Sequence, residues 1–124
     1  MAPRWITSSL DEFGRGLGLR TLALDAQGTA TLRFENGWRL RFEYAEPFLT
    51  VMITMEMEQD ETQMARVLTA ANPEVERPYA LRAGYFVSTH EAVFAVRLEE
   101  REVTLVVLEA AFQELWGTVV GLKG

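Results

Sequence analysis

The residue types that most often perform catalysis are few in this chain and do not form a catalytic set. His90 is the only histidine, and it lies beside Glu91 in a predicted turn. One histidine in a chain without cysteine cannot supply the several ligands of a zinc site, so His90 is best explained as a solvated turn residue. Ser8 and Ser9 have no histidine nearby in the sequence and no G-x-S-x-G elbow. Lys123 lies at the end of the chain and is a poor general base.

Two short motifs also lack the pattern of a ligand site. Residues 14–18 read GRGLG, without the spacing of a phosphate loop or a strand before it. The second motif is a cluster of four carboxylates: Glu56, Glu58, Asp60 and Glu61. It lacks the spaced ligands and central glycine of an EF-hand loop, and a predicted helix N-terminus explains it, since the helix dipole favours negative charge there. We expect no catalytic residue, cofactor or metal.

Composition narrows the class of protein. The 124 residues are 48% apolar and 24% charged, which fits one globular domain over residues 1–124. A net charge of −6, with eleven scattered arginines and one lysine, disfavours nucleic acid and anionic membranes as partners. No apolar run approaches the length of a membrane span, and the N-terminus lacks the apolar core of a signal peptide. We therefore expect a soluble intracellular protein.

Apolar periodicity predicts an α+β fold, a twisted antiparallel sheet flanked by three helices in the order α-β-β-β-β-α-β-β-α. The first helix carries the stripe Ile6, Leu10, Phe13 and Leu17. Four alternating segments then predict strands over about 21–25, 30–34, 38–44 and 48–57, with Asn36-Gly37 as a hairpin turn. The remaining elements are a helix over about 60–71, strands over 79–87 and 92–98, and a largely buried last helix from about Thr104.

Three glycines near the end of the first helix need an explanation. Gly14, Gly16 and Gly18 each cost about 1 kcal/mol relative to alanine inside a helix. Gly18 is well placed as the left-handed residue that ends the helix. A C-cap does not explain all three, so we expect another segment to approach the helix backbone closely.

Several large apolar residues lie off the main stripes of the predicted elements. They are Trp5, Met52, Met57, Val106 and Val107. Two interpretations stay open: these side chains fill irregular gaps in the core, as methionine often does, or they form exposed apolar patches that bind partners.

The sequence resembles the class I chaperones of bacterial type III secretion over nearly its full length. The N-terminal resemblance lies in LDEFGRGLGL (10–19) and LALDAQGTATL (22–32). The segments LRAGYF (81–86) and VFAVRLEEREVTLVVLEAAFQEL (93–115) are similar to the SycN subgroup, which serves the YopN-type secretion gatekeeper.

The resemblance implies a non-catalytic function. Class I chaperones are small acidic dimers without ATPase activity, and they hold the N-terminal segment of a secreted protein in an extended, secretion-competent state. SycN-type members pair with a second chaperone of the YscB kind, so a homodimer and a heterodimer both stay open. The implied location is the bacterial cytoplasm and the periphery of the secretion apparatus.

The resemblance also implies which residues bind partners. The first helix and first hairpin would hold the secreted protein through Trp5, Ile6, Leu10, Phe13, Gly14, Leu22, Leu24, Leu32 and Phe34. The dimer interface would contain Met64, Val67, Leu68, Tyr79, Leu81 and Tyr85. Trp5 lies off the helix stripe, as an exposed anchor would, and the short strand 21–25 would be an edge open to strand addition.

Two other classes of function remain as alternatives. One is a small regulatory protein that sequesters a transcriptional or secretion regulator, which the identity of a co-purified partner would distinguish. The other is an enzyme of unrecognised type, against which the lack of a nucleophile, base and orienting group argues.

Overall fold

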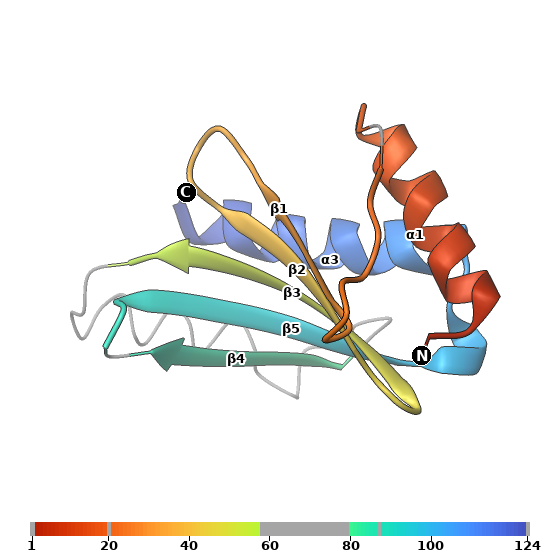
Figure 1. The fold of residues 1–124 in the computed structure, drawn as a ribbon. Helices are drawn as coiled ribbons and strands as arrows, with labels where there is room; N and C mark the ends of the chain where they lie inside the picture. Colours follow the sequence, from red (N-terminus) through yellow and green to blue (C-terminus); the bar gives the residue numbers. More distant parts are fainter. Residues whose placement is uncertain (1, 20, 58–79, 87, 124) are drawn as a thin grey trace.

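The computed structural model describes residues 2–19, 21–57, 80–86 and 88–123, and its ribbon is drawn in Figure 1. The elements are α1 (Arg4–Gly16), β1 (Thr29–Arg33), β2 (Arg39–Ala45), β3 (Phe48–Glu56), β4 (Leu81–Phe86), β5 (Glu91–Glu99), the 3-10 turn η1 (Glu100–Glu102) and α3 (Leu105–Lys123). The five strands form one antiparallel sheet in the order β1-β2-β3-β5-β4. Among the described elements, β1 and β4 are therefore the two edges of the sheet.

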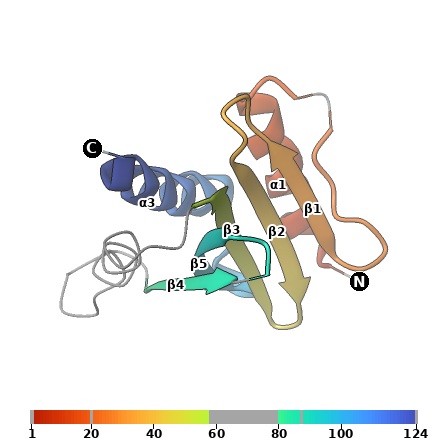
Figure 2. The same ribbon diagram turned by 90° about the vertical axis from the view of Figure 1, so that its left-hand side faces the viewer.

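Both described helices pack on the same face of the sheet, as the two views show together (Figures 1 and 2). Alternate residues of the central strands point toward the helices and are fully buried, among them Phe42 of β2, Ile53 of β3 and Phe94 of β5. Phe13 of α1 meets Phe42 edge to face, with ring centroids 5.8 Å apart, and meets Phe112 of α3 at 5.7 Å. The core thus lies between one face of the sheet and two helices.

The β1–β2 hairpin forms at the predicted Asn36-Gly37 turn. The Asn36 side-chain oxygen accepts the backbone N–H of Trp38 at 3.0 Å, and Gly37 has a φ of +90° that favours glycine. Register then places Leu32 opposite Leu40. The hairpin end carries aromatic rings that pack against α3. The ring centroids of Phe34 and Trp38 lie 5.0 and 4.9 Å from the ring centroid of Trp116.

The last helix begins where the sequence predicts. The Thr104 hydroxyl accepts the backbone N–H of Val107 at 3.2 Å, and the Thr104 carbonyl accepts that of Leu108 at 2.9 Å, so Thr104 caps the helix. The predicted helix over 60–71, with Met64, Val67 and Leu68, lies outside the described residues.

The predicted strand over Thr21–Asp25 is wrong, and the sheet has five described strands rather than six. These five residues have no regular secondary structure. Leu22 is buried against α1 instead, and Asp25 is held in a turn, where its backbone N–H donates to the Thr29 carbonyl at 2.8 Å. The alternation of Leu22 and Leu24 therefore reflects packing against a helix and not pairing in a sheet.

The glycines at the end of α1 have different roles. Gly18, with a φ of +86°, ends the helix in a Schellman motif: its N–H donates to the Arg15 carbonyl at 3.0 Å, and the N–H of Leu19 donates to the Gly14 carbonyl at 2.9 Å. A Cβ on Gly14 would lie 2.6 Å from the Cβ of Leu22, so the expected close approach occurs within this chain. Around Gly16 nothing lies within 4 Å of the Cβ position.

This difference predicts opposite effects for two matched substitutions in α1. Gly14→Ala should destabilise the protein by about 1–3 kcal/mol, because the added methyl overpacks the contact with Leu22. Gly16→Ala should stabilise it by about 0.5–1 kcal/mol, because alanine restricts the unfolded chain and has space in the folded one. Urea unfolding of both variants measures the difference, and equal effects would contradict the role assigned to Leu22.

Candidate partner-binding groove

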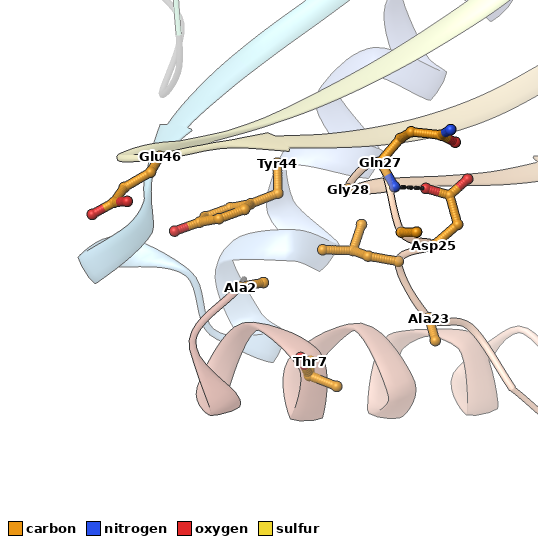
Figure 3. A pocket seen from close by; sticks show the side chains of 10 residues that line it. Ala2, Thr7, Ala23, Asp25, Gln27, Gly28, Tyr44 and Glu46 are labelled. Carbon is orange, nitrogen blue, oxygen red and sulfur yellow. Dashed lines mark hydrogen bonds between the residues drawn. The ribbon is translucent and has the colours of Figure 1, made fainter.

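A groove of about 640 Å³ lies between α1, the segment that follows it and the far end of β2 (Figure 3). Its lining comes from three parts of the chain: Ala2, Thr7, Ala23, Leu24, Asp25, Ala26, Gln27, Gly28, Tyr44 and Glu46. Small and polar side chains dominate this lining, and Leu24 is its largest aliphatic residue.

A tight turn shapes one wall of the groove. The Asp25 side-chain oxygen Oδ1 accepts the backbone N–H groups of Gln27 and Thr29, each at 2.9 Å. Gly28 has a φ of +77°, and a Cβ at this position would lie 2.7 Å from the Tyr44 carbonyl oxygen. Only glycine fits here, because both the backbone conformation and the space exclude a side chain.

Glu100 connects the ends of α1 and β2 beside this groove. Its carboxylate accepts the Tyr44 hydroxyl at 2.5 Å, which is typical of a charge-assisted O–H···O bond, and its backbone carbonyl accepts the Trp5 indole N–H at 2.9 Å. The Trp5 side chain keeps 49% of its surface exposed, so the predicted exposure of Trp5 is confirmed. Its polar edge is thus held by η1 while an apolar part of the ring faces solvent.

The same carboxylate changes the acidity of Tyr44. The pKa of the Tyr44 hydroxyl is raised from 10.0 to about 12, chiefly by its hydrogen bond to Glu100, then by burial and by the negative charges of Glu100 and Glu46. The hydroxyl therefore stays protonated at neutral pH and acts as a hydrogen-bond donor.

Among the described residues, the lining of the groove holds no set of catalytic groups. Its ionisable side chains are Asp25, Tyr44 and Glu46, and no histidine, lysine or cysteine lines it. Within the described residues, no group of three or more histidine, cysteine, aspartate or glutamate side chains is placed to hold a metal ion. His90 is exposed in the turn before β5, as predicted, with Nδ1 3.4 Å from the Tyr85 hydroxyl.

The edge of β1 lies beside this groove and offers backbone groups. Even-numbered residues of β1 bond to β2, because at one end the Gly28 carbonyl accepts the Tyr44 N–H and at the other the Phe34 N–H donates to the Trp38 carbonyl. The N–H and C=O groups of Thr31 and Arg33 therefore point away from the sheet. Such an edge can accept a further strand.

The residues predicted to hold a secreted protein separate into two groups. Ile6, Leu10, Phe13, Gly14 and Leu22 are buried in the core of this chain. Leu24, Leu32 and Phe34 are half-buried near the groove and the β1 edge, and Trp5 is exposed. The surface that a partner can reach without rearrangement contains the second group.

The residues predicted for a dimer interface are only partly described. Met64, Val67, Leu68 and Tyr79 lie outside the described residues. Leu81 is buried, and the half-buried Tyr85 donates its hydroxyl to the Met57 carbonyl at 2.8 Å. Their strand, β4, is an edge of the sheet, and its last residue Phe86 is 57% exposed.

Sequence reasoning missed the Tyr44–Glu100 pair, because 56 residues separate the two and neither belongs to a motif. The residues off the main stripes divide by burial, and binding by the exposed ones stays a prediction. Met57 fills the core, whereas Trp5 and Val106 are exposed, the latter by 76%. The expectation that the last helix is largely buried is wrong on the side of Val106 and Val120.

Several solved structures share this fold. The ExsC–ExsE complex matches with a TM-score of 0.72 and 18% identity over 90% of this chain and 86% of that chain. The Yersinia pestis type III secretion chaperone SycH, in complex with a fragment of YscM2, matches with a TM-score of 0.72 and 17% identity over 94% and 98% of the two chains. The HopA1–SchA chaperone–effector complex matches at 0.67 and 18%, over 97% and 91%. No curated protein sequence matches significantly.

The family is shown by the sequence itself. The family model described as Type III secretory system chaperone SycN matches residues 5–119, and the chain belongs to that family. It is therefore a class I type III secretion chaperone and not an enzyme, which confirms the predicted class. No helix among the described residues is long and apolar enough to cross a membrane.

The Tyr44–Glu100 contact predicts how the Tyr44 hydroxyl titrates in the wild type and in a variant without the Glu100 carboxylate. Glu100→Gln should lower the Tyr44 pKa from about 12 toward 10, because it removes the carboxylate that raises it. Since the folded-state pKa is the higher one, the contact stabilises the wild-type fold fully below pH 10 and progressively less as the pH rises toward 12. Ultraviolet absorbance of tyrosinate follows the titration, and Tyr44→Phe should remove the high-pKa step. A step that persists in Tyr44→Phe would assign it to another tyrosine.

Proposed function

We propose that this chaperone holds the N-terminal segment of a secreted gatekeeper of the YopN kind in an extended state. The observation that carries the proposal is the edge of β1, which pairs with no other described strand on its outer side and has the outward backbone groups of Thr31 and Arg33, beside a groove at the base of α1. An extended segment needs backbone partners along its length and pockets for alternate side chains, and an edge next to a groove supplies both.

Apolar contacts would supply most of the affinity in such a complex. Leu24, Leu32 and Phe34 are half-buried near the edge, so a partner could complete their burial. Trp5 presents an exposed ring whose orientation is held by its hydrogen bond to Glu100. Ordering an extended segment costs several kcal/mol, so these anchors have to outweigh that cost. A rigid aromatic side chain loses little entropy on binding and suits this role.

We also propose that the chain dimerises, with itself or with a second chaperone of the YscB kind. Support comes from the edge of β4, which has no strand partner among the described residues, from the exposed Phe86 at its end and from the apolar sequence pattern of Met64, Val67 and Leu68. A dimer would place two grooves along one secreted chain. The proposed location is the bacterial cytoplasm, at the periphery of the secretion apparatus, where chaperone and secreted protein meet.

If Trp5 is an anchor for the partner, substitutions of Trp5 should change binding affinity and folding stability by different amounts. Trp5→Ala should weaken binding of a YopN-type N-terminal segment by about 2 kcal/mol, the threshold of a hot spot. It should also cost about 1 kcal/mol of folding stability, because the hydrogen bond to Glu100 is lost. Trp5→Phe loses the same hydrogen bond but keeps an apolar ring. Isothermal titration and thermal unfolding of both variants compare the two effects.

If Trp5 contacts the partner, the Trp5→Phe variant should keep most of the binding affinity. Its folding stability should nevertheless be as low as that of Trp5→Ala, because both variants lose the hydrogen bond to Glu100. If both variants lose affinity in proportion to their stability, Trp5 acts through the fold and the binding surface lies elsewhere.

The dimer proposal predicts a change in mass. Val67→Asp should convert the dimer to monomers or aggregates in analytical ultracentrifugation, because a stable interface buries about 1,200–2,000 Å² and does not tolerate an unpaired carboxylate at its centre. Val106→Asp is the matched control, since Val106 is exposed on α3. An unchanged dimer in the Val67→Asp variant would contradict this interface.

A further inference from the structure

The segment that joins α1 to β1 begins a hairpin that it does not complete. The Asp25 carbonyl accepts the backbone N–H of Gly28 at 3.0 Å, and the Asp25 N–H donates to the Thr29 carbonyl at 2.8 Å. With Gly28 in the left-handed region, at a φ of +77°, these two bonds are those of a three-residue hairpin loop. The arm after the loop is β1, whereas the arm before it, residues 21–25, is not a strand. We call residues 21–25 the unpaired arm.

The loop determines which residues would face each other if the unpaired arm joined β1. Counting outward from the loop, Ala23 comes opposite Thr31, and Thr21 comes opposite Arg33. The hydrogen bonds between β1 and β2 lead independently to the same pairs, since they leave the N–H and C=O groups of Thr31 and Arg33 pointing away from the sheet. Two such pairs would add four backbone hydrogen bonds at the edge of β1.

The side chains of the unpaired arm alternate as those of a half-buried strand do. In the paired register Leu22 and Leu24 would lie on the same face of the sheet as Leu32, toward the helices, and Ala23 would lie on the opposite face with Thr31. Leu32 is half-buried in the structure, so Leu22 and Leu24 would complete its burial. The arm therefore has the apolar pattern of a further strand at this edge.

A contact with α1 holds the unpaired arm away from β1. Leu22 is 4% exposed and packs where Gly14 has no side chain, since a Cβ there would lie 2.6 Å from the Leu22 Cβ. Ala23 and Leu24 then line the groove on the helix side of the sheet, whereas Thr31 lines a hollow on the opposite face. Figures 1 and 2 show the arm and β1 close together at the loop and apart where the arm approaches α1. Pairing requires Leu22 to leave α1 and the Ala23 side chain to turn to the other face.

We propose that the unpaired arm has a second arrangement, in which it pairs with β1 and closes the edge offered to a secreted segment. This inference rests on the proposed function of that edge and adds a competition, because the arm and a bound segment need the same backbone groups of Thr31 and Arg33. An exposed edge favours aggregation, so the chain's own arm would protect it while no partner is bound. The contact of Leu22 with Gly14 sets the balance, since it is made only while the edge is open.

Engineered disulfides test the paired register. The chain contains no cysteine, so an introduced pair is the only one present. Residues of a hydrogen-bonded antiparallel pair have Cα atoms about 5.5 Å apart, which a disulfide can bridge, whereas diagonal neighbours are about 7–8 Å apart. The variant with Ala23→Cys and Thr31→Cys should therefore oxidise about tenfold faster in glutathione buffer than the control with Ala23→Cys and Thr29→Cys.

A loose segment without a register would give the opposite order of oxidation rates. The control closes the shorter loop, so chain proximity alone favours its disulfide over that between positions 23 and 31. Equal or faster oxidation of the control would therefore overturn the proposal. No partner is present in this measurement, and its result is independent of the proposed function.

The oxidised variant also tests the competition. With positions 23 and 31 joined, binding of the YopN-type N-terminal segment should weaken by about tenfold or more, because the edge is occupied, and dithiothreitol should restore it. Isothermal titration of the oxidised and reduced forms measures the change, with Ala23→Cys alone and Thr31→Cys alone as controls. Unchanged affinity in the oxidised form would mean that the arm and the segment do not compete.

Amide exchange separates pairing of the arm from a simple loss of stability. Gly14→Ala should displace Leu22 from α1 and favour the paired arrangement, so the amides of Thr31 and Arg33 should exchange about threefold to tenfold more slowly although the fold as a whole is less stable. Gly16→Ala is the matched control, because its added methyl group meets no atom within 4 Å, and it should leave both rates unchanged. Unchanged or faster exchange in Gly14→Ala would mean that the arm is only loosened, which contradicts the proposal.

Exchange in the wild type distinguishes failure of this inference from failure of the proposed function. A secreted segment that pairs with β1 should protect the Thr31 amide when it binds. Binding without that protection would refute the function proposed for the edge. The ratio of the two oxidation rates would still decide whether the unpaired arm pairs with β1.

Discussion

The contact of three phenylalanines holds this architecture together. Phe13 of α1 packs edge to face against Phe42 of β2 and against Phe112 of α3, with centroid distances of 5.8 and 5.7 Å. Rings in this geometry combine a large buried area with a favourable orientation of their quadrupoles. Because the three rings come from both helices and the sheet, this one contact sets how α1 lies over the strands. The groove at the base of α1 exists only in that arrangement.

Covering one face of the sheet has consequences for the rest of the molecule. Helices on one side leave the two edge strands unpaired and the opposite face in solvent, among the described elements. Exposed edges favour aggregation unless they are protected or paired with another chain. The surplus of apolar surface is therefore consistent with the family to which the chain belongs.

The groups beside the groove show how a binding protein differs from an enzyme in its use of polar residues. The Glu100 carboxylate raises the pKa of Tyr44 to about 12, which moves the hydroxyl away from the range useful for acid–base chemistry at neutral pH. The Glu100 carbonyl also fixes the indole of Trp5. Both contacts hold side chains at the surface in one orientation. A preorganised surface loses less entropy when a partner binds.

Much of the fold could be predicted from local patterns. The stripe of Ile6, Leu10 and Phe13 predicted α1, Asn36-Gly37 predicted the hairpin, and the alternation over residues 48–57 predicted β3, because these signals act between near neighbours. The candidate site residues named from the sequence are mostly apolar. Their division into buried residues, such as Leu10, and accessible ones, such as Leu24, did not follow from the pattern.

The sequence by itself determined the class of fold and the family, since periodicity carries the fold and the match of residues 5–119 to the SycN family model carries the family. Only the tertiary structure decided that Leu22 packs on Gly14 instead of pairing in the sheet, because a period of two fits a strand and an extended segment on a helix equally well. It also decided that Glu100 joins Trp5 to Tyr44 and that Arg33 faces Arg39, since these contacts depend on which strands become neighbours. Long-range pairing is set by the packing of the whole core, which no local spacing records.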